Sequence, residues 1–447
     1  MGISRILLLK GTIWTSAAFA VAQLLRLVTN VVLARLLAPQ LFGVMQIFYS
    51  LRTGADLLTD VGMGQNIIYN KNAEEPDFYN TAWTINVIRG VLLWFLFCAV
   101  SFYVASFYQS EILRLVMPIA SVTFVLGSLS SMSPFLLQKR MQYNTLTKFE
   151  ISVGALSSLA PIVIAYFSPT VWALVFGSIA GTTISMIASH LILPNVRQKL
   201  FISSLYAKQI LSFGKWIFAS SIIYFLSTNF DRLYLAKLIT FDLLGVYGVA
   251  RTFSELVSGF VLRIGSNVIF PFISSHSNMP RAELRVQLLP IRMKFLLLSG
   301  LGLSLFAALA DLVIEILYDQ RYHAASWMLP ILITGAWFSI LANLNDSTLL
   351  GLGKPHYSAF GNGAKFAFLI VGLTVGVSRF GILGGVVVVA AADIWRYFPL
   401  LVGQIREQFS FARQDLLTTV IVFGLIALWE WLRWTAGFHT SFSSLPI

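Results

Sequence analysis

The sequence predicts an all-α polytopic membrane protein, built as two parallel six-helix lobes with an additional helix at the C-terminus. Three observations support this fold class. The 447-residue chain is 57% hydrophobic and only 11% charged, whereas soluble domains contain about 25% charged residues. Its apolar stretches recur along the whole chain and not in one segment. Two of these stretches are also similar to each other, which indicates an internal repeat.

The repeat joins residues 14–44 to residues 216–246. They align without a gap at an offset of 202, so that Trp14 falls on Trp216. Six predicted spans separate the copies, and the copies therefore have the same orientation in the membrane. A parallel repeat of this kind is typical of secondary transporters with a central site between two lobes.

Windows of about 20 apolar residues predict the individual spans. They are 11–34, 41–68, 80–106, 112–137, 150–168, 170–193, 213–238, 243–272, 291–317, 326–351, 358–378, 381–403 and 415–436. Six spans form an N-terminal lobe in residues 1–200 and six a C-terminal lobe in residues 201–405. Residues 406–447 then hold the additional transmembrane helix and a tail. A basic amphipathic connector over 194–211 is expected to lie at the membrane surface and join the lobes.

The charge distribution predicts the orientation and excludes several protein classes. With the N-terminus in the cytoplasm, most loop lysines and arginines fall on the cytoplasmic side, as the positive-inside rule requires. The net charge of +12 does not indicate a nucleic-acid-binding protein, because no basic module stands apart from the spans. The lone Cys98 and the scattered histidines predict neither a disulfide nor a metal site. No loop is long enough for a catalytic domain.

Eight basic residues fall inside the predicted spans, where each costs at least about 2.5–3.5 kcal/mol near the bilayer centre. They are Arg26, Arg52, Arg89, Arg232, Arg251, Arg263, Lys365 and Arg396. Such residues face either an ion-pair partner or a water-filled cavity. Arg26, Arg89 and Arg263 have no acid within four residues, and this favours a functional role for them.

Other basic residues in the spans have simpler interpretations. The four-residue spacing predicts the ion pairs Arg52–Asp56 and Arg251–Glu255, which fit a structural role and a functional one equally well. Arg232 lies near the outer end of its span, and an interfacial position is expected for it. Lys365 and Arg396 are long enough to extend toward the cytoplasmic surface.

The alternative interpretation is a cationic cavity for an anionic substrate, since the planar fork of arginine suits phosphate. No Gly-rich nucleotide-binding loop accompanies these residues, so an ion gradient or substrate loading is expected to drive transport. We expect no cofactor apart from coupled H⁺ or Na⁺. The acids that are candidates for ion coupling, and equally candidates for structural pairing, are Asp56, Asp60, Glu255, Asp346 and Asp393.

Six segments carry a family resemblance. They are 26–44 (RLVTNVVLARLLAPQLFGV), 57–65 (LLTDVGMGQ), 138–143 (QKRMQY), 231–235 (DRLYL), 243–250 (LLGVYGVA) and 350–355 (LGLGKP). In order and spacing they resemble bacterial polysaccharide flippases of the Wzx type. These belong to the superfamily that also holds MATE multidrug exporters and lipid II flippases. The resemblance extends to about residue 403.

The resemblance implies a MATE-like V of two six-helix lobes with alternating access, in the bacterial inner membrane. It implies flipping of undecaprenyl-pyrophosphate-linked oligosaccharide repeat units from the cytoplasmic to the periplasmic leaflet. These units serve exopolysaccharide, capsule or O-antigen synthesis. The partners expected beside this substrate are membrane lipid, a polysaccharide polymerase and a chain-length regulator.

We expect contact with the pyrophosphate or with anionic sugars from six arginines: Arg26, Arg52, Arg89 and Arg263 first, then Arg251 and Arg232. Three alternatives stay open at this stage. An ion-coupled multidrug exporter would prefer cationic drugs, which an arginine-lined cavity disfavours. A lipid II flippase would use the same charge chemistry. A membrane glycan polymerase or ligase would need a long periplasmic loop, which this sequence lacks.

Overall fold

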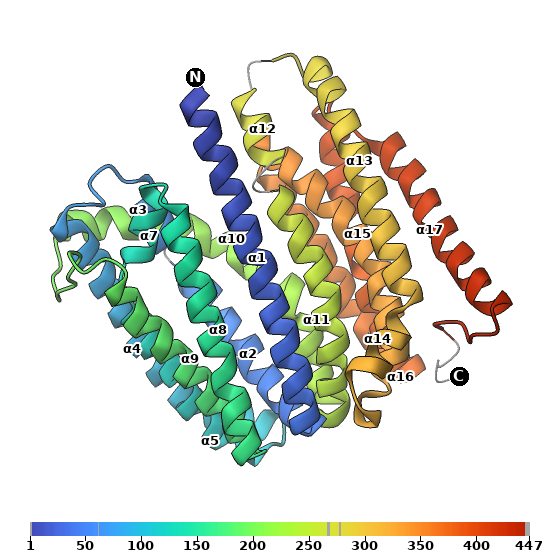
Figure 1. The fold of residues 1–447 in the computed structure, drawn as a ribbon, viewed down its shortest axis with the longest axis horizontal. Coiled ribbons are helices and arrows are strands. Elements are labelled where there is room, and N and C mark those ends of the chain that lie inside the picture. Colours follow the sequence, from blue (N-terminus) through green and yellow to red (C-terminus); the bar gives the residue numbers. More distant parts are fainter. Residues whose placement is uncertain (1, 61, 266–268, 277–278, 443–447) are drawn as a thin grey trace. The chain divides into compact units, whose positions relative to one another are not determined.

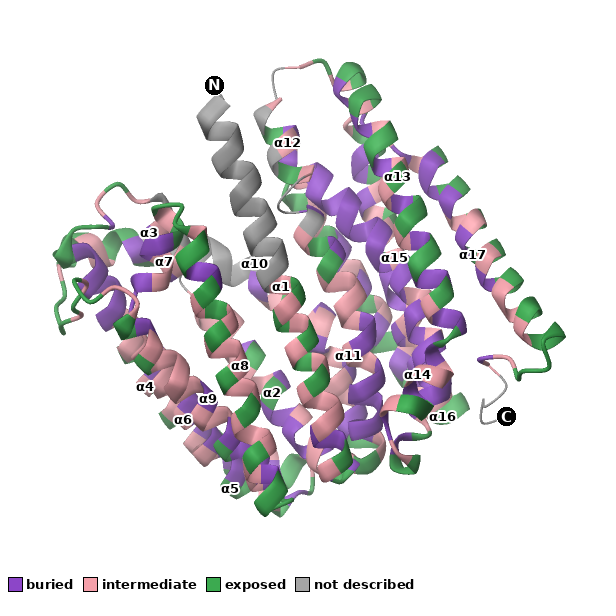
Figure 2. Ribbon diagram, viewed as in Figure 1, coloured by how far each residue is buried: buried purple, intermediate pink, exposed green. Residues whose placement is uncertain are grey.

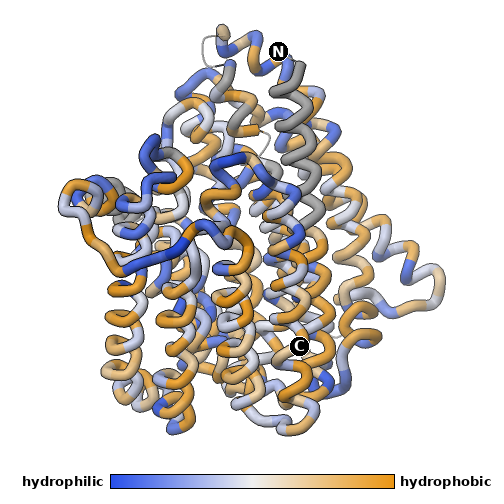
Figure 3. The backbone as a smooth tube through the Cα atoms, turned by 60° about the vertical axis from the view of Figure 1, so that its left-hand side comes forward, coloured by the Kyte–Doolittle hydropathy of each residue, from blue (hydrophilic) through white to orange (hydrophobic). Residues whose placement is uncertain are grey.

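The computed structural model describes residues 2–60, 62–265, 269–276 and 279–442, with side chains from residue 19 onward except at 65, 69, 212–220, 264, 271 and 275. These ranges are helical apart from short connections, and they contain no strand. Nine helices within them are long and apolar enough to cross a membrane, judged by length and composition. Figure 3 shows these helices as mostly hydrophobic along their length. The prediction of an all-α, multi-pass membrane protein is therefore confirmed.

The chain divides into two compact units, Met1–Ile222 and Ile223–Ile447. The first unit holds α1 (Gly2–Leu36), α2 (Pro39–Thr59), α3 (Met63–Tyr69), α4 (Pro76–Phe107), α5 (Glu111–Ala120), α6 (Val122–Ser128), α7 (Ser133–Lys139), α8 (Tyr143–Phe167), α9 (Val171–Leu191) and the start of α10 (Ser204–Leu238). The lobe boundaries predicted at residues 200 and 405 come from the internal repeat, whereas the two units are defined by their compactness. The lobe boundaries therefore stay predictions.

The second unit continues from α10. It holds α11 (Phe241–Ile264), α12 (Phe270–Ser275), α13 (Arg281–Ala308), α14 (Ala310–Leu317), the 3₁₀ turn η2 (Gln320–Tyr322), α15 (Ala325–Gly351), α16 (His356–Arg406) and α17 (Ala412–Thr435). The helix α16 contains two of the predicted spans, because Gly381 interrupts its helical backbone with φ 57° and ψ −147°. Such a conformation is open essentially to glycine alone.

The internal repeat appears in the helix boundaries. The first helices of the two copies, α1 and α10, begin and end 202 residues apart, and the next pair, α2 and α11, begin at Pro39 and Phe241, again 202 apart. This is the offset at which the two sequence segments align. The side chains of Trp14 and Trp216 lie outside the described residues. Two helices in each copy therefore follow the repeat that the sequence shows.

The predicted span 41–68 is broken into α2 and α3 for a local reason. Gly62 has a left-handed backbone with φ 68°, and its N–H donates to Asp60 Oδ1 at 2.9 Å. A carboxylate that accepts a main-chain N–H two residues ahead stabilises a turn in place of a continuing helix. Asp60 thus ends the helix that carries Arg52 and Asp56.

The connector after α9 is held against the start of α4. Residues 194–203 are not helical, and the helix begins only at Ser204. Three alternate residues of this segment donate their main-chain N–H groups to side chains in the first turns of α4, at 2.8–3.0 Å. The pairs are Lys199 with Asn80, Phe201 with Thr84, and Ser203 with Thr81. These polar side chains satisfy the extended backbone of the connector, and its position at the membrane surface stays a prediction.

A bidentate ion pair between Arg140 and Glu74 links two connecting segments of the first unit. Arg140 donates from Nη2 to Glu74 Oε2 at 2.9 Å and from Nε to Oε1 at 3.3 Å. These hydrogen bonds hold the pKa of the Glu74 carboxyl below its ordinary value. The pair joins the loop before α4 to the end of α7.

The core of the second unit is built around α15. Of its most apolar 18-residue window, 78% is buried, and Figure 2 shows α15 almost entirely as buried residues. It packs against α11, α13, α14 and α16. Asn343, Asn345 and Asp346 are buried near its C-terminal end, so they need polar partners from those neighbours.

The C-terminal helix α17 is part of this second unit. It packs along α13, as Figure 1 shows. Val422 and Ile426 are buried, and Trp337 of α15 donates to Thr419 Oγ1 at 2.9 Å. The additional helix is thus fixed to the core of its unit through both apolar and polar contacts.

Candidate functional site

The first unit brings α2 and α4 together around Arg89 of α4. Its guanidinium donates to Thr59 Oγ1 at 2.7 Å, to the Asp56 carboxylate at 3.0 Å and to the Asp56 carbonyl at 3.1 Å. Thr59 lies one turn after Asp56 on α2, so a single guanidinium reaches both. The sequence offers Arg89 no acid within four residues, which favoured a functional role over an ion pair. The structure shows an ion pair nonetheless, because Asp56 approaches from another helix.

Arg52 is held more loosely beside the same carboxylate. Its Nε lies 3.8 Å from Asp56 Oδ2, and its guanidinium carbon lies 5.7 Å from the centre of the Phe124 ring. The exposed fractions of the Arg52, Arg89 and Asp56 side chains are 27%, 20% and 47%. All three line a cavity of about 180 Å³. Two guanidinium groups thus face one carboxylate in a space that a ligand can reach. We name this the arginine cavity.

A larger cavity of about 660 Å³ adjoins the arginine cavity, because Asp56, Asn86 and Arg89 line both. Asp60 lines the larger cavity as well. Its Oδ1 already accepts the Gly62 N–H, so this carboxylate has a part in the backbone turn as well as a place in the cavity wall.

The second unit holds its own charged cluster between α10 and α11. Asp231, with 2% of its side chain exposed, lies 3.2 Å from Arg251 Nε and accepts from the Tyr247 hydroxyl at 2.5 Å. Arg251 also lies 3.6 Å from Glu255, whose carboxylate accepts from Arg232 at 2.5 Å. Two bases therefore meet two acids, and only Glu255 is substantially exposed, at 42%.

Two further intramembrane bases of the second unit, Lys365 and Arg396, are each paired with one acid. Lys365 lies 2.8 Å from Asp393 within α16, and Arg396 lies 2.8 Å from Asp346. All four side chains are at most 12% exposed. The expectation that Lys365 and Arg396 extend toward the cytoplasmic surface is therefore wrong, since each ends on a buried carboxylate.

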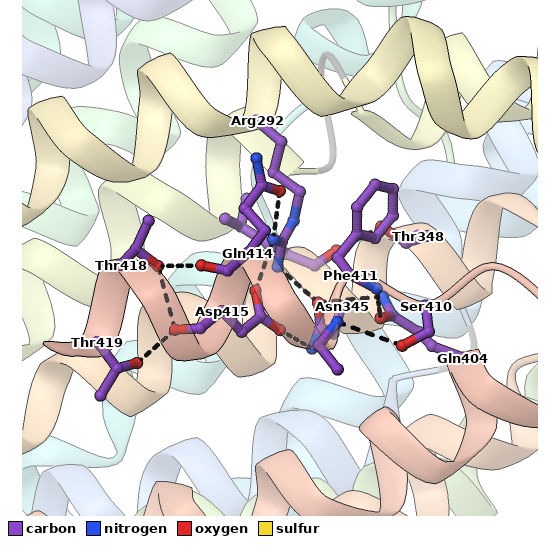
Figure 4. A network of polar contacts seen from close by, with 12 residues as sticks. Arg292, Asn345, Thr348, Gln404, Ser410, Phe411, Gln414, Asp415, Thr418 and Thr419 are labelled. Carbon is purple, nitrogen blue, oxygen red and sulfur yellow. Dashed lines mark hydrogen bonds and ion pairs between the residues drawn. The ribbon is translucent and has the colours of Figure 1, made fainter. Parts of the chain in front are cut away.

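A further buried network centres on Arg292 and Asp415, which lie 2.5 Å apart. Arg292 also donates to Gln414 and Asn345, and Asn345 donates to Asp415 (Figure 4). Tyr397 of α16 donates to the same carboxylate at 2.9 Å. Both charged side chains are at most 3% exposed. The network joins α13, α15, α16 and α17.

The sequence alone does not reveal this network or the partner of Asp231. Arg292 stands at the edge of a predicted span, and Asp415 begins the last one. Asp231 adjoins Arg232 in sequence but points to another side of its helix. All three acids and bases find partners on other helices, and the spacing along one helix cannot reveal such partners.

Two other predicted arginines, Arg26 and Arg263, stand apart from these clusters. Arg26 is exposed on α1, between Leu24 and Val28, which are 64% and 54% exposed. Arg263 lies twelve residues after Arg251 on α11, about 18 Å along a helix axis, and it is half-buried. Arg232 belongs to the cluster between α10 and α11, where it pairs with Glu255 and is 13% exposed; its interfacial position stays a prediction.

Comparison with known proteins identifies the family. Residues 32–327, more than half of the chain, match the family model described as polysaccharide biosynthesis protein. The chain belongs to this polysaccharide biosynthesis family.

Two relatives are similar to this protein over most of its chain. The teichuronic acid biosynthesis protein TuaB of Bacillus subtilis (strain 168) is 24% identical over 78% of this chain and 72% of its own length. A putative O-antigen transporter of Shigella flexneri is 23% identical over 85% of this chain and 93% of its own length.

Solved structures show the same fold. The lipid II flippase MurJ, in an inward closed conformation, has a TM-score of 0.72 at 13% identity, covering 95% of this chain and 92% of MurJ. An inward-facing MATE multidrug transporter has a TM-score of 0.66 at 13% identity, covering 87% and 94%. This polysaccharide biosynthesis protein thus has the fold of the superfamily that holds lipid II flippases and MATE exporters, as the sequence resemblance implied.

Proposed function

We propose that this protein flips undecaprenyl-pyrophosphate-linked oligosaccharide repeat units from the cytoplasmic to the periplasmic leaflet of the bacterial inner membrane. Family membership and the similarity to an O-antigen transporter support transport of a glycan for the cell surface. The fold shared with a lipid II flippase supports a lipid-linked substrate. The protein acts as a transporter and not as an enzyme, with membrane lipid and the lipid-linked oligosaccharide as its partners.

The observation that carries the proposal is the arginine cavity of the first unit. Arg52 and Arg89 share the single carboxylate of Asp56 and stay partly exposed, which leaves one excess positive charge for a pyrophosphate. The clusters of the second unit contain equal numbers of bases and acids. We therefore place the first contacts at Arg52 and Arg89. In our proposal, the further contacts with the pyrophosphate or acidic sugars are Arg26, Arg263, Arg251 and Arg232.

Coupling to H⁺ or Na⁺ requires an acid that water can reach. Asp56 and Glu255 are 47% and 42% exposed, and Asp60 lines the 660 Å³ cavity. Asp346 and Asp393 are buried against a base. We propose the first three as coupling residues before the last two. We also propose a cytoplasmic N-terminus, alternating access of two lobes in a V, and cooperation with a polymerase and a chain-length regulator.

The test is genetic and uses the distribution of lipid-linked glycan between leaflets. Deleting the gene is expected to leave lipid-linked repeat units on the cytoplasmic leaflet, and the wild-type gene to restore their periplasmic exposure. Arg52→Gln is expected to fail to restore it at equal protein level. Arg114→Gln is the matched control, because Arg114 is exposed and lies 5.1 Å from the centre of the Phe102 ring, outside the arginine cavity.

Three outcomes would contradict parts of this proposal. Full rescue by Arg52→Gln would keep the flippase and remove the arginine cavity as its site. Accumulation of the peptidoglycan precursor lipid II in the deletion strain would indicate a lipid II flippase. Raised drug sensitivity without any accumulated glycan would indicate a multidrug exporter.

A further inference from the structure

A cavity of about 670 Å³ in the first unit has a wall rich in hydroxyl groups. It lies among α1, α2, α6, α8 and α9. Ser178, Thr182 and Ser185 follow one another at spacings of four and three residues, so they share one face of α9. Thr29 and Ser157 contribute from α1 and α8. No charged side chain lines the cavity among the described residues. We name it the hydroxyl cavity.

The protons of three of these hydroxyl groups, those of Thr29, Ser178 and Thr182, are already committed. Thr29 donates to the carbonyl of Leu25 at 2.7 Å, and Ser178 donates to that of Val175 at 2.7 Å. Thr182 donates to the carbonyl of Ser178 at 2.8 Å. A hydroxyl has one proton and two lone pairs, so the oxygen of each group is left to accept. These three oxygens therefore favour a ligand group that donates hydrogen bonds.

A main-chain acceptor in the same wall strengthens this selection. Pro161 of α8 has no N–H to give to the carbonyl of Ser157, four residues earlier. The Ser157 carbonyl therefore lacks this helical hydrogen bond. The Ser157 hydroxyl is a separate group, and it donates to the carbonyl of Gly181 on α9 at 3.1 Å. A Cβ on Gly177 would lie 2.4 Å from Pro161 Cβ. The two helices are thus packed too closely here for larger side chains to replace the polar wall.

The chemistry of the hydroxyl cavity restricts its ligand. Several acceptors without a nearby carboxylate favour a neutral group with several donors over a cation. Leu33, Val153 and Leu174 add apolar surface to the same wall. A sugar ring combines C–H faces with many hydroxyl donors, and a volume of this size is typical of small-molecule sites.

Its position links the hydroxyl cavity to the arginine cavity. Gly127 of α6 lines both, so a residue without a side chain is the wall they share. We propose that the hydroxyl cavity receives an uncharged sugar of the glycan while Arg52 and Arg89 contact the pyrophosphate. This subsite rests on the proposed flippase function. It predicts that sugars near the pyrophosphate are recognised through their hydroxyl groups.

The test compares two probes on the purified full-length protein in lipid nanodiscs. One probe is undecaprenyl pyrophosphate, and the other is the lipid-linked repeat unit extracted from cells that lack this gene. Thr182→Val removes one acceptor and keeps the side-chain shape. Thr183→Val is the matched control, since Thr183 makes the same 2.8 Å bond to a carbonyl one turn earlier but does not line the cavity. Ser178→Ala is a second variant should Thr182→Val fail to fold.

We expect Thr182→Val to weaken binding of the glycan-bearing probe roughly three- to tenfold, as for the loss of one neutral hydrogen bond. Binding of undecaprenyl pyrophosphate should not change, and the control should behave as wild type with both probes. Equal losses for both probes, or no loss for the glycan-bearing probe, would overturn the sugar subsite. A wild-type protein that binds neither probe would overturn the flippase function and the subsite together.

Discussion

Arg52 and Arg89 line the same cavity but differ in how firmly the protein holds them. Arg89 makes hydrogen bonds to a carboxylate, a hydroxyl and a carbonyl of α2. Arg52 has the 3.8 Å approach to Asp56 and a contact with the Phe124 ring. A guanidinium with few internal bonds keeps its donors for a ligand, whereas one with many also ties helices together. The two residues should therefore differ in their effect on stability.

We predict that Arg89→Gln lowers both stability and transport, while Arg52→Gln lowers transport with little effect on stability. Loss of the hydrogen bonds of Arg89, two of them to Asp56, is expected to cost about 1–3 kcal/mol. The measurements are thermal unfolding of the purified protein and the leaflet distribution of lipid-linked glycan. Equal unfolding temperatures for the two variants would contradict the division of roles.

At this scale the sequence predicts residue types better than partners. The four-residue spacing located Arg52 near Asp56 and Arg251 near Glu255, and the structure shows both approaches. The shorter contacts are Arg89 with Asp56 and Arg251 with Asp231. Each joins residues on different helices. These depend on how helices pack, and the hydrophobic period of a span does not encode which neighbour it meets.

At the scale of elements, the two halves of α16 approach each other unusually closely. A Cβ on Gly384 would lie 2.1 Å from the carbonyl oxygen of Gly376. The sequence predicted the two spans and their separation near residue 380, because an apolar run of this length cannot be one span. It did not predict that the connection reduces to Gly381.

We predict that Gly384→Ala destabilises the protein strongly, because the clash is with backbone that cannot move without separating the two halves. The cost should exceed about 2 kcal/mol, as in overpacked cores. Gly363→Ala is the control in the same helix, since a Cβ there meets nothing within 4 Å, and it should stabilise slightly. Thermal unfolding in detergent measures both. A smaller loss for Gly384→Ala than for other buried substitutions would argue against the close approach.

The buried ion pair between Arg292 of α13 and Asp415 of α17 holds α17 against its unit. Removing one partner of such a pair leaves a charge without compensation. We predict that Asp415→Asn lowers the free energy of unfolding by about 3–5 kcal/mol. Arg321→Gln is the control, because Arg321 pairs with Asp319 at the surface, where both side chains are more than a third exposed. It should change stability by less than about 1 kcal/mol. The expected order would be disproved if both variants unfolded at the same temperature.

At the scale of the whole molecule, the repeat and the charge asymmetry make one joint prediction. The boundaries of α1 and α10 follow the 202-residue offset, and both halves place most basic loop residues on one predicted side. A parallel repeat requires that corresponding loops of the two halves face the same side of the membrane. The orientation of each half can be measured separately, because the chain has a single cysteine, Cys98.

We predict the orientation from cysteines placed at exposed positions in loops or in the first turn of a helix, in a Cys98→Ser background. A membrane-impermeant maleimide applied to intact spheroplasts should label Arg114→Cys in the first half and Gln320→Cys in the second. Lys71→Cys and His356→Cys should react only after the membrane is opened. Labelling of Lys71→Cys in intact cells would reverse the proposed cytoplasmic N-terminus. If Arg114→Cys and Gln320→Cys reacted from opposite sides, the repeat would be inverted and not parallel, and the arginines of the two halves would then approach the substrate from opposite membrane faces.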